Sequence, residues 1–393
     1  MDNLKAQPIV IGFSHYNTLG LLRSLGEAGY RPTLVLIRER DSDLSSFVAK
    51  SKYIGTCYFT SEDKLIETLK NIKVDNSKCM LFPSGDSVAE ILDKSYDDLS
   101  SIFIVPNIAG IQNSLRNANH KENMRLCAEE FGFNSPKTWV IKSISENMVD
   151  DIVFPVIIKA IHSQDASKNI QIFNSKEELL PVVDALLKQS DEVQIQTFID
   201  KEKEVIYLGW ACNDDVCIPC LMEKIREYPP KFGGTGFGYF SPDVNKYFDI
   251  EQLKEVIRSY RYTGLFSVEY IIYAGIPYFL EINFRNDGNG YFPGFGGVNL
   301  PVQLMLRCNG KAVCPDNRIS GSFYMMREYN DYKWRKQNGY PLYNWLKDIS
   351  KVSVFQYWNP SDIFPFIFFM KEHVANLLSN KIKRALRQLH LLR

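Results

Sequence analysis

The sequence of 393 residues has no excess of either charge, because its 46 Lys and Arg residues equal its 46 Asp and Glu residues in number. A chain without net charge gives no electrostatic reason to expect nucleic acid as its main partner. Its longest apolar cluster, IFPFIFFM, is too short to span a bilayer and contains a proline. The first residues, MDNLKAQPIVIGF, lack the basic start, long apolar run and cleavage site of a secretion signal. We therefore expect a cytoplasmic protein.

The eight cysteines are scattered, and only Cys217 and Cys220 form a close pair. A metal knuckle would need a second pair, or histidines at ligand spacing, and none follows. Their segment, DDVCIPC, alternates like a strand, whereas a redox dithiol usually begins a helix. We therefore expect reduced structural thiols. The G-x-G-x-x-G fingerprint is also missing after the first strand, which disfavours dinucleotide binding.

The N-terminal part shows a repeating α/β pattern. The buried run PIVIGF precedes an amphipathic helix that ends at Gly29, and the strand RPTLVLI follows. Similar units continue to about Asn107 and predict a small doubly wound domain. Ligands of such sheets bind beyond the carboxyl ends of the strands, where the sequence places Ser14 and Asp86. Asp86 equally fits the role of a cap for the helix SVAEILDK.

The middle of the chain alternates between helices, strands and loops. A helix is predicted over 113–132, and FPVIIKA predicts a short buried strand that ends in Lys159. VQIQTFID predicts an alternating strand, and 204–223 a hairpin. The glycines and prolines of IREYPPKFGGTGFGYFSP predict a loop, either a flexible surface hairpin or an active-site cover. In the second case, Arg226 would reach a substrate.

Two apolar strands, LFSVEYIIY and YFLEINF, each contain one glutamate. Antiparallel pairing around the turn YAGIP would bring Glu269 and Glu281 together. Facing carboxylates repel unless a cation lies between them. Asn283 shares the strand face of Glu281, so two carboxylates and an amide oxygen make a hard oxygen site that suits Mg²⁺ and phosphate. Arg285 falls on that face if the strand persists, and offers a planar fork for a carboxylate or phosphate.

Lys121 near the start of a helix, then FPVIIKA, VQIQTFID and VEYII…YFLEINFRNDG, together resemble the ATP-grasp carboxylate–amine ligases. The resemblance covers about residues 1–310. The continuation NFRNDGNGY…GVNLP is most similar to the D-aspartate ligase-like branch.

The resemblance implies an α/β fold in three parts. A doubly wound pre-ATP-grasp domain would occupy 1–112. The ATP-grasp domain, two α+β subdomains that clasp ATP, would occupy 113–310, with a lid subdomain at about 137–200. A C-terminal helical extension would occupy 311–393.

The resemblance also implies how ATP is bound. Lys121 and Lys159 would hold its phosphates from the two sides of the cleft. Gln196 would face the adenine amino group, and the backbone of Thr197 and Ile199 would complete the adenine pairing.

The remaining roles concern the ribose, the metal and the phosphoryl group. Glu204 would bind the ribose hydroxyls. Glu269, Glu281 and Asn283 would bind two Mg²⁺ ions that bridge the phosphates, with Mn²⁺ as a substitute. Arg285 would steady the transferring phosphoryl group and the acyl phosphate.

The loop IHSQDASKNIQIF departs from the family pattern, because the corresponding loop is usually rich in glycines whose amides close over phosphate. Ser163, Ser167 and Lys168 offer side-chain substitutes. Beside Arg285, the residues expected near the substrates are Ser14, Asp86 and Arg226.

The implied activity is ATP-dependent amide formation through an acyl phosphate, with release of ADP and phosphate. The substrates would be a small carboxylate and an amine, one of them an amino acid, and a role related to the cell envelope is a further expectation. A non-catalytic ATP-binding regulatory protein is one alternative, which the glycine-free loop favours. A carboxyphosphate-forming enzyme is another, although the chain shows no biotin domain. The family also implies a homodimer as an expectation.

The end of the extension predicts an amphipathic basic helix. Apolar residues recur at helical spacing from Phe366, and lysines and arginines occupy the opposite face. Such a helix either packs on the enzyme body or makes a peripheral contact with a membrane.

Overall fold

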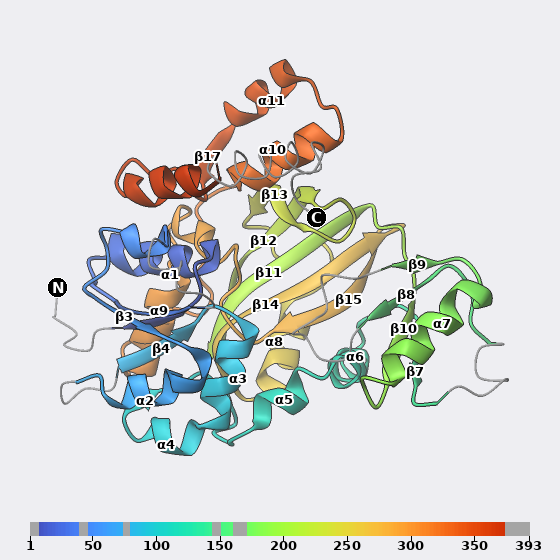
Figure 1. The fold of residues 1–393 in the computed structure, drawn as a ribbon, viewed down its shortest axis with the longest axis horizontal. Coiled ribbons are helices and arrows are strands. Elements are labelled where there is room, and N and C mark those ends of the chain that lie inside the picture. Colours follow the sequence, from blue (N-terminus) through green and yellow to red (C-terminus); the bar gives the residue numbers. More distant parts are fainter. Residues whose placement is uncertain (1–7, 39–45, 74–78, 144–150, 160–170, 374–393) are drawn as a thin grey trace, which may run out of the picture.

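The computed structural model describes residues 8–38, 46–73, 79–143, 151–159 and 171–373, with Lys159 described for its backbone alone. Three sheets organise this part of the chain (Figure 1). None of its described helices is long and apolar enough to cross a membrane.

The N-terminal sheet is parallel, with the strand order β3-β2-β1-β4-β5. Its strands are β1 (Ile9–Gly12), β2 (Thr33–Ile37), β3 (Thr56–Thr60), β4 (Cys79–Pro83) and β5 (Phe103–Ile104). The helices are α1 (Tyr16–Glu27), α2 (Leu65–Lys70), α3 (Asp86–Lys94) and α4 (Tyr96–Ser100). Short 3₁₀ turns lie at Val48–Lys50 and Glu62–Lys64. The chain reverses its winding direction between β1 and β4, which is where doubly wound sheets bind ligands.

The second sheet is antiparallel and has the order β7-β10-β8-β9. It contains β7 (Thr138–Ile141), β8 (Val156–Lys159), β9 (Ile172–Phe173) and β10 (Val193–Thr197), with α7 (Lys176–Leu187) packed against it. A separate apolar core holds it together. Helices α5 (Ser114–Ala118) and α6 (Lys121–Glu130) precede it, so the helix predicted over 113–132 is in fact interrupted.

The large sheet has the order β15-β14-β11-β12-β13-β16-β17, and β6 (Asn107–Ile108) pairs with β14. Its strands are β11 (Lys203–Cys212), β12 (Asp215–Tyr228), β13 (Gly234–Ser241), β14 (Tyr262–Tyr273), β15 (Ile276–Asn283), β16 (Phe323–Met326) and β17 (Val352–Phe355). The accompanying helices are α8 (Ile250–Ser259), α9 (Leu300–Cys308), α10 (Glu328–Gln337) and α11 (Leu342–Ile349), with a 3₁₀ turn at Phe292–Gly294. Cys217 and Cys220 are free and buried on β12, which confirms that their segment is a strand.

The prediction of a loop over the glycine-rich segment is wrong for most of its residues, because β12 and β13 pair there as an antiparallel hairpin, which was one of the two expected arrangements. The glycines of β13 have a packing role instead. A Cβ at Gly236 would lie 3.1 Å from the backbone of Asp331 at the start of α10, and a Cβ at Gly238 would lie 3.2 Å from the sulfur of Met325. Glycine in a strand permits this close approach.

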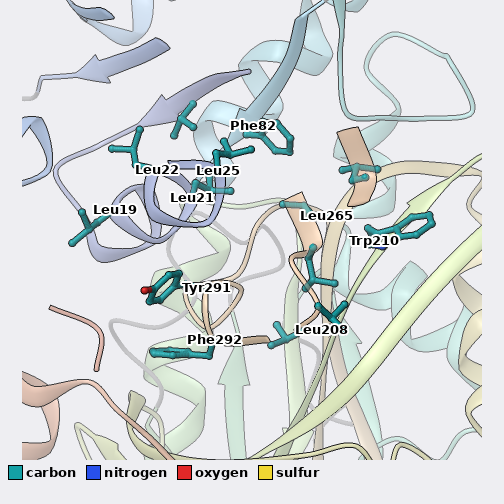
Figure 2. Close-up of a cluster of buried hydrophobic side chains, with 14 of the residues drawn as sticks. Leu19, Leu21, Leu22, Leu25, Phe82, Leu208, Trp210, Leu265, Tyr291 and Phe292 are labelled. Carbon is teal, nitrogen blue, oxygen red and sulfur yellow. The ribbon is translucent and has the colours of Figure 1, made fainter. Parts of the chain in front are cut away.

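One apolar core joins the N-terminal sheet to the large sheet (Figure 2). Leu19 and Leu22 of α1 lie in the same cluster as Leu208 and Trp210 of β11 and Phe292. The site between these sheets is therefore built on continuous packing.

The C-terminal extension returns to α1. Arg23 of α1 donates from Nε to Asp362 at 3.0 Å, and both side chains are fully buried. Residues 363–373 are helical, and the ring of Phe369 stacks on that of Tyr357 with centroids 3.8 Å apart. The described start of the predicted helix thus packs on the body; residues 374–393 lie outside the described part.

The substitution Asp362→Ala is expected to destabilise the protein by roughly 3–5 kcal/mol, because it leaves the Arg23 guanidinium buried without its anion. Urea unfolding measures the change. The control is Asp98→Ala, which removes the partner of Lys70 from an exposed pair and should cost at most about 1 kcal/mol. Similar losses in both variants would contradict a buried ion pair at Arg23.

Candidate active site

A cleft of about 500 Å³ lies between the second sheet and the large sheet; we call it the inter-sheet cleft. Its walls come from α6, β8, β10 and the segment after β10, and from β11, β12, β14 and β15 of the large sheet. Of the residues predicted for ATP and metal binding, it is lined by Lys121, Gln196, Thr197, Ile199, Glu204, Glu269 and Glu281.

Gln196 carries an unused acceptor at one end of this cleft. Its Nε2 donates to Thr138 Oγ1 at 3.1 Å, whereas its buried Oε1 has no partner in the described part of the chain. A buried acceptor without a donor is costly, and an amino group from a ligand would satisfy it. This fits the adenine amino group that the resemblance predicted for Gln196.

A group of alternating charges surrounds Glu204. Its carboxylate contacts the ammonium groups of Lys224 and Lys201, and Lys201 also contacts Glu227 at 2.9 Å. Burial alone would raise the pKa of Glu204, but Lys224 and Lys201 outweigh it and lower that pKa. Sequence reasoning missed both lysines. The register of the predicted hairpin could have identified Lys224, because Glu204 pairs directly with it.

Glu269 and Glu281 lie directly opposite each other on β14 and β15. Lys121 Nζ is 3.6 Å from Glu281 Oε2. Burial, aided by the charge of Glu281 and opposed by Lys224, raises the pKa of Glu269 to about 8. The raised pKa thus reflects mainly the removal of this carboxylate from water, and the facing carboxylate adds to it.

This carboxylate pair fits a divalent cation, because an ion between the two groups would remove their repulsion. The described residues contain no group of three or more His, Cys, Asp and Glu side chains placed to hold a metal, so other ligands must complete the shell. Phosphate oxygens are suitable. Asn283 directs Nδ2 at Glu269 Oε1 (3.3 Å), and its Oδ1 accepts from Arg285 (3.2 Å). Its amide must therefore turn over to offer the metal an oxygen.

A second cavity, of about 470 Å³, lies at the switch point of the N-terminal sheet; we call it the switch-point cavity. Three predicted residues line it: Ser14, Asp86 and Arg285. Arg285 donates to both carboxylate oxygens of Asp86, at 2.7 and 3.1 Å. Although burial opposes it, the Asp86 carboxylate raises the pKa of Arg285, which stays charged. Tyr16 lines both this cavity and the inter-sheet cleft, and sequence reasoning missed it.

The prediction that Arg226 meets a substrate is wrong for the described structure, since Arg226 lines neither cavity. It donates to Asp331 at 2.7 and 3.0 Å and to Asp348 at 2.7 Å. The reason is an irregular register on both sides of Arg226 in β12. Such a bulge changes which side chains face the cleft. Glu227, the next residue, lines the cleft instead.

Two predicted phosphate ligands cannot be placed by their side chains. The backbone of Lys159 ends β8 opposite Gln194 of β10, but its side chain lies outside the described part of the chain. Lys168 and the glycine-free loop lie outside it as well.

In metal-free protein, Glu269→Gln is expected to flatten the pH dependence of stability. The pKa of Glu269 is raised from its ordinary value of 4.5 to about 8, so the folded state keeps a proton that the unfolded state loses. The free energy of unfolding therefore falls as the pH rises through this window, and glutamine removes that fall.

Urea unfolding in EDTA at about pH 5.5 and pH 8.5 measures the effect. The control is Glu255→Gln, which changes an exposed residue on α8. If wild type and Glu269→Gln lose equal stability over this interval, the raised pKa is wrong.

Comparison with known proteins places this geometry in context. No family model matches the chain. It is 23% identical over 327 residues to a D-aspartate ligase of Enterococcus faecium (strain Aus0004), covering 76% of each chain.

Among solved structures, an L-amino acid ligase from Bacillus licheniformis matches with a TM-score of 0.57 and 14% identity over 77% of this chain and 74% of that one. The ADP complex of N5-carboxyaminoimidazole synthetase from Staphylococcus aureus matches with a TM-score of 0.63 and 14% identity over 86% and 87%. Biotin carboxylase from Campylobacter jejuni matches with a TM-score of 0.64 and 13% identity over 80% and 74%. The chain therefore has the ATP-grasp fold and is similar in sequence to a D-aspartate ligase.

Proposed function

We propose that the chain is an ATP-dependent carboxylate–amine ligase that forms an amide through an acyl phosphate. One observation carries the proposal. Glu269 on β14 and Glu281 on β15 face each other in the inter-sheet cleft. Arg285, which follows shortly after the end of β15, lines the neighbouring switch-point cavity. A phosphoryl group held by the carboxylate pair would thus lie near an arginine that can reach the second substrate.

In the proposed complex, ATP occupies the inter-sheet cleft. Gln196 Oε1 accepts from the adenine amino group, and the backbone of Thr197 and Ile199 completes the adenine pairing. Glu204 accepts hydrogen bonds from the ribose hydroxyls, so its carboxylate must contact Lys201, Lys224 and the ribose at the same time. Lys121, Lys159 and Lys168 bind phosphate oxygens.

Glu269, Glu281 and, after rotation of its amide, Asn283 would hold Mg²⁺, or Mn²⁺ in its place. The bound ions would neutralise charge on the phosphates during transfer. Lys121, whose Nζ lies 3.6 Å from Glu281 Oε2, would add a positive charge next to the phosphates. Water must be kept away from the acyl phosphate until the amine attacks, which is the reason for a closed cleft in this chemistry.

The carboxylate substrate would enter the switch-point cavity beside Ser14, Asp86 and Arg285. Arg285 would orient the carboxylate and then stabilise the negative charge of the acyl phosphate. Asp86 holds the guanidinium in place and keeps it charged. An amino acid is the proposed substrate, because the curated relative is a D-aspartate ligase and a fold neighbour is an L-amino acid ligase. An envelope-related product fits such a ligase.

Carboxylation through carboxyphosphate is the second candidate, because biotin carboxylase is among the fold neighbours. Phosphate release that depends on bicarbonate rather than on an amine would favour it. A homodimer, a peripheral membrane contact through the C-terminal helix and a cytoplasmic location stay predictions; residues 374–393 lie outside the described part.

The test is ATP-dependent phosphate release in a screen of D- and L-amino acids with amine acceptors, with mass spectrometry of the amide product. The substitution Glu281→Gln should lower turnover at least about a hundredfold, since it removes charge that acts on the metal and phosphates in the transition state. Circular dichroism should show an unchanged fold.

The control is the exposed variant Glu255→Gln, which should keep full turnover. Retained turnover in Glu281→Gln would sink the metal-site assignment. ATP binding without any amide product across the screen would favour the non-catalytic regulatory protein.

A further inference from the structure

Five lysines and arginines are buried in the part of the chain that the structure describes: Arg23, Lys121, Arg226, Lys254 and Arg327. Four of them lie within 4.0 Å of a carboxylate. Arg327 forms no ion pair among the described residues, although its side chain is only 1% exposed. A buried charge is retained only where something compensates it.

The hydrogen bonds of Arg327 go to neutral groups. Its Nη1 donates to the Thr235 carbonyl at 3.1 Å, and its Nη2 to the Gly288 carbonyl at 3.3 Å and to Asn289 Oδ1 at 3.2 Å. Its buried Nε has no partner in the described part of the chain. The adjacent Glu328 forms no ion pair with Arg327 in the described structure; its carboxylate accepts from three backbone amides of residues 356–358. These contacts fix the guanidinium without cancelling its charge.

Arg327 lies directly behind the walls of both cavities. A Cβ added to Gly288, which lines the switch-point cavity, would lie 3.2 Å from Nη2. A Cβ added to Gly234, which lines the inter-sheet cleft, would lie 3.4 Å from Nη1. The guanidinium is also 3.7 Å from the ring centroid of Tyr16, which lines both cavities. Two glycines and one aromatic ring therefore separate this charge from the ligand space.

None of the charged groups that line the switch-point cavity forms an ion pair with Arg327 in the described structure. Asp86 is neutralised by Arg285. Asp287 also lines this cavity and accepts from the backbone and side chain of Asn289, at 2.7 and 2.8 Å; these neutral donors leave its carboxylate charged and without an ion pair in the described structure. The side chain of His15 is exposed, and partial desolvation in this cavity together with the charges of Arg327 and Arg285 lowers its pKa. The field of Arg327 thus reaches a residue of this cavity.

We infer that Arg327 is a positioning residue whose unpaired charge offsets the carboxylate of Asp287 and makes the switch-point cavity selective for a substrate with an anionic group. It acts through Gly288 and Tyr16 rather than by touching the substrate. Anionic oxygens could come from the substrate carboxylate or from the ATP phosphates, because Gly234 borders the ATP side. The carboxylate is favoured, since the hydrogen bonds at Gly288 and Asn289 anchor Arg327 to the loop of the switch-point cavity. The inference rests on the proposed function only for the identity of this ligand.

The test compares Arg327→Met and Arg327→Lys by isothermal titration calorimetry, with no ligation required. The probes are D-aspartate and its diamide, which keeps the amino group but has no carboxylate, each added with Mg²⁺ and a non-hydrolysable ATP analogue, and the analogue alone. Wild type should bind D-aspartate more tightly than the diamide. The methionine variant should bind D-aspartate roughly tenfold more weakly, as expected for one charge acting across several ångströms of protein. Its affinity for the diamide should not fall, and its affinity for the nucleotide should be unchanged.

Arg327→Lys keeps the charge and should retain most of the preference for the acid, which a purely structural role would not predict. Arg318→Met is the matched control, because Arg318 bonds only to carbonyls of its own loop at Asp316 and Asn317 in the described structure. Should Arg327→Met fail to fold, Arg327→Gln carries the same expectation.

A selective loss of nucleotide affinity would assign the charge to the ATP phosphates and overturn the inference. Equal binding of D-aspartate and its diamide by wild type would also overturn it. Absence of ligation with the acid preference intact would reject the proposed function alone.

Discussion

The central constraint in this molecule is the pairing of Glu269 with Glu281 across two antiparallel strands. Two charged carboxylates at directly opposed positions repel each other unless a cation lies between them. Burial raises the pKa of Glu269 in the metal-free protein, and the charge of Glu281 adds to that rise. The neighbouring cations Lys121 and Lys224 reduce the repulsion but do not remove it. The same pair therefore destabilises the metal-free protein and forms the basis of the proposed magnesium site.

The second requirement is that this pair lies next to a place for the substrate. The N-terminal sheet supplies that place at its switch point, and Arg285 connects the two through its bidentate contact with Asp86. Tyr16 lines both cavities, so the start of α1 borders both proposed ligands. One continuous apolar core between α1 and the large sheet keeps these parts in register (Figure 2).

The C-terminal extension supplies several of the buried charged residues of the protein. It supplies Asp362 to Arg23 and Asp331 to Arg226, and each pair is hydrogen-bonded within the interior. It also supplies Arg327, which has no acid partner among the described residues. The contrast separates two uses of a buried arginine. A paired one specifies how the extension docks, and an unpaired one behind a cavity wall is available to an anionic ligand.

The sequence alone determined the strands that carry Glu269 and Glu281, and their pairing, because the two strands are neighbours in the chain and a short turn joins them. Alternation and turn signals act over a few residues, so a reading of the sequence can use them. Tertiary structure alone decided the contact between Arg285 and Asp86, which lie 199 positions apart. It also decided that a bulge in β12 turns Arg226 towards the extension and that Arg327 packs behind two glycine walls. No local pattern encodes these outcomes, because each depends on how distant elements pack against one another.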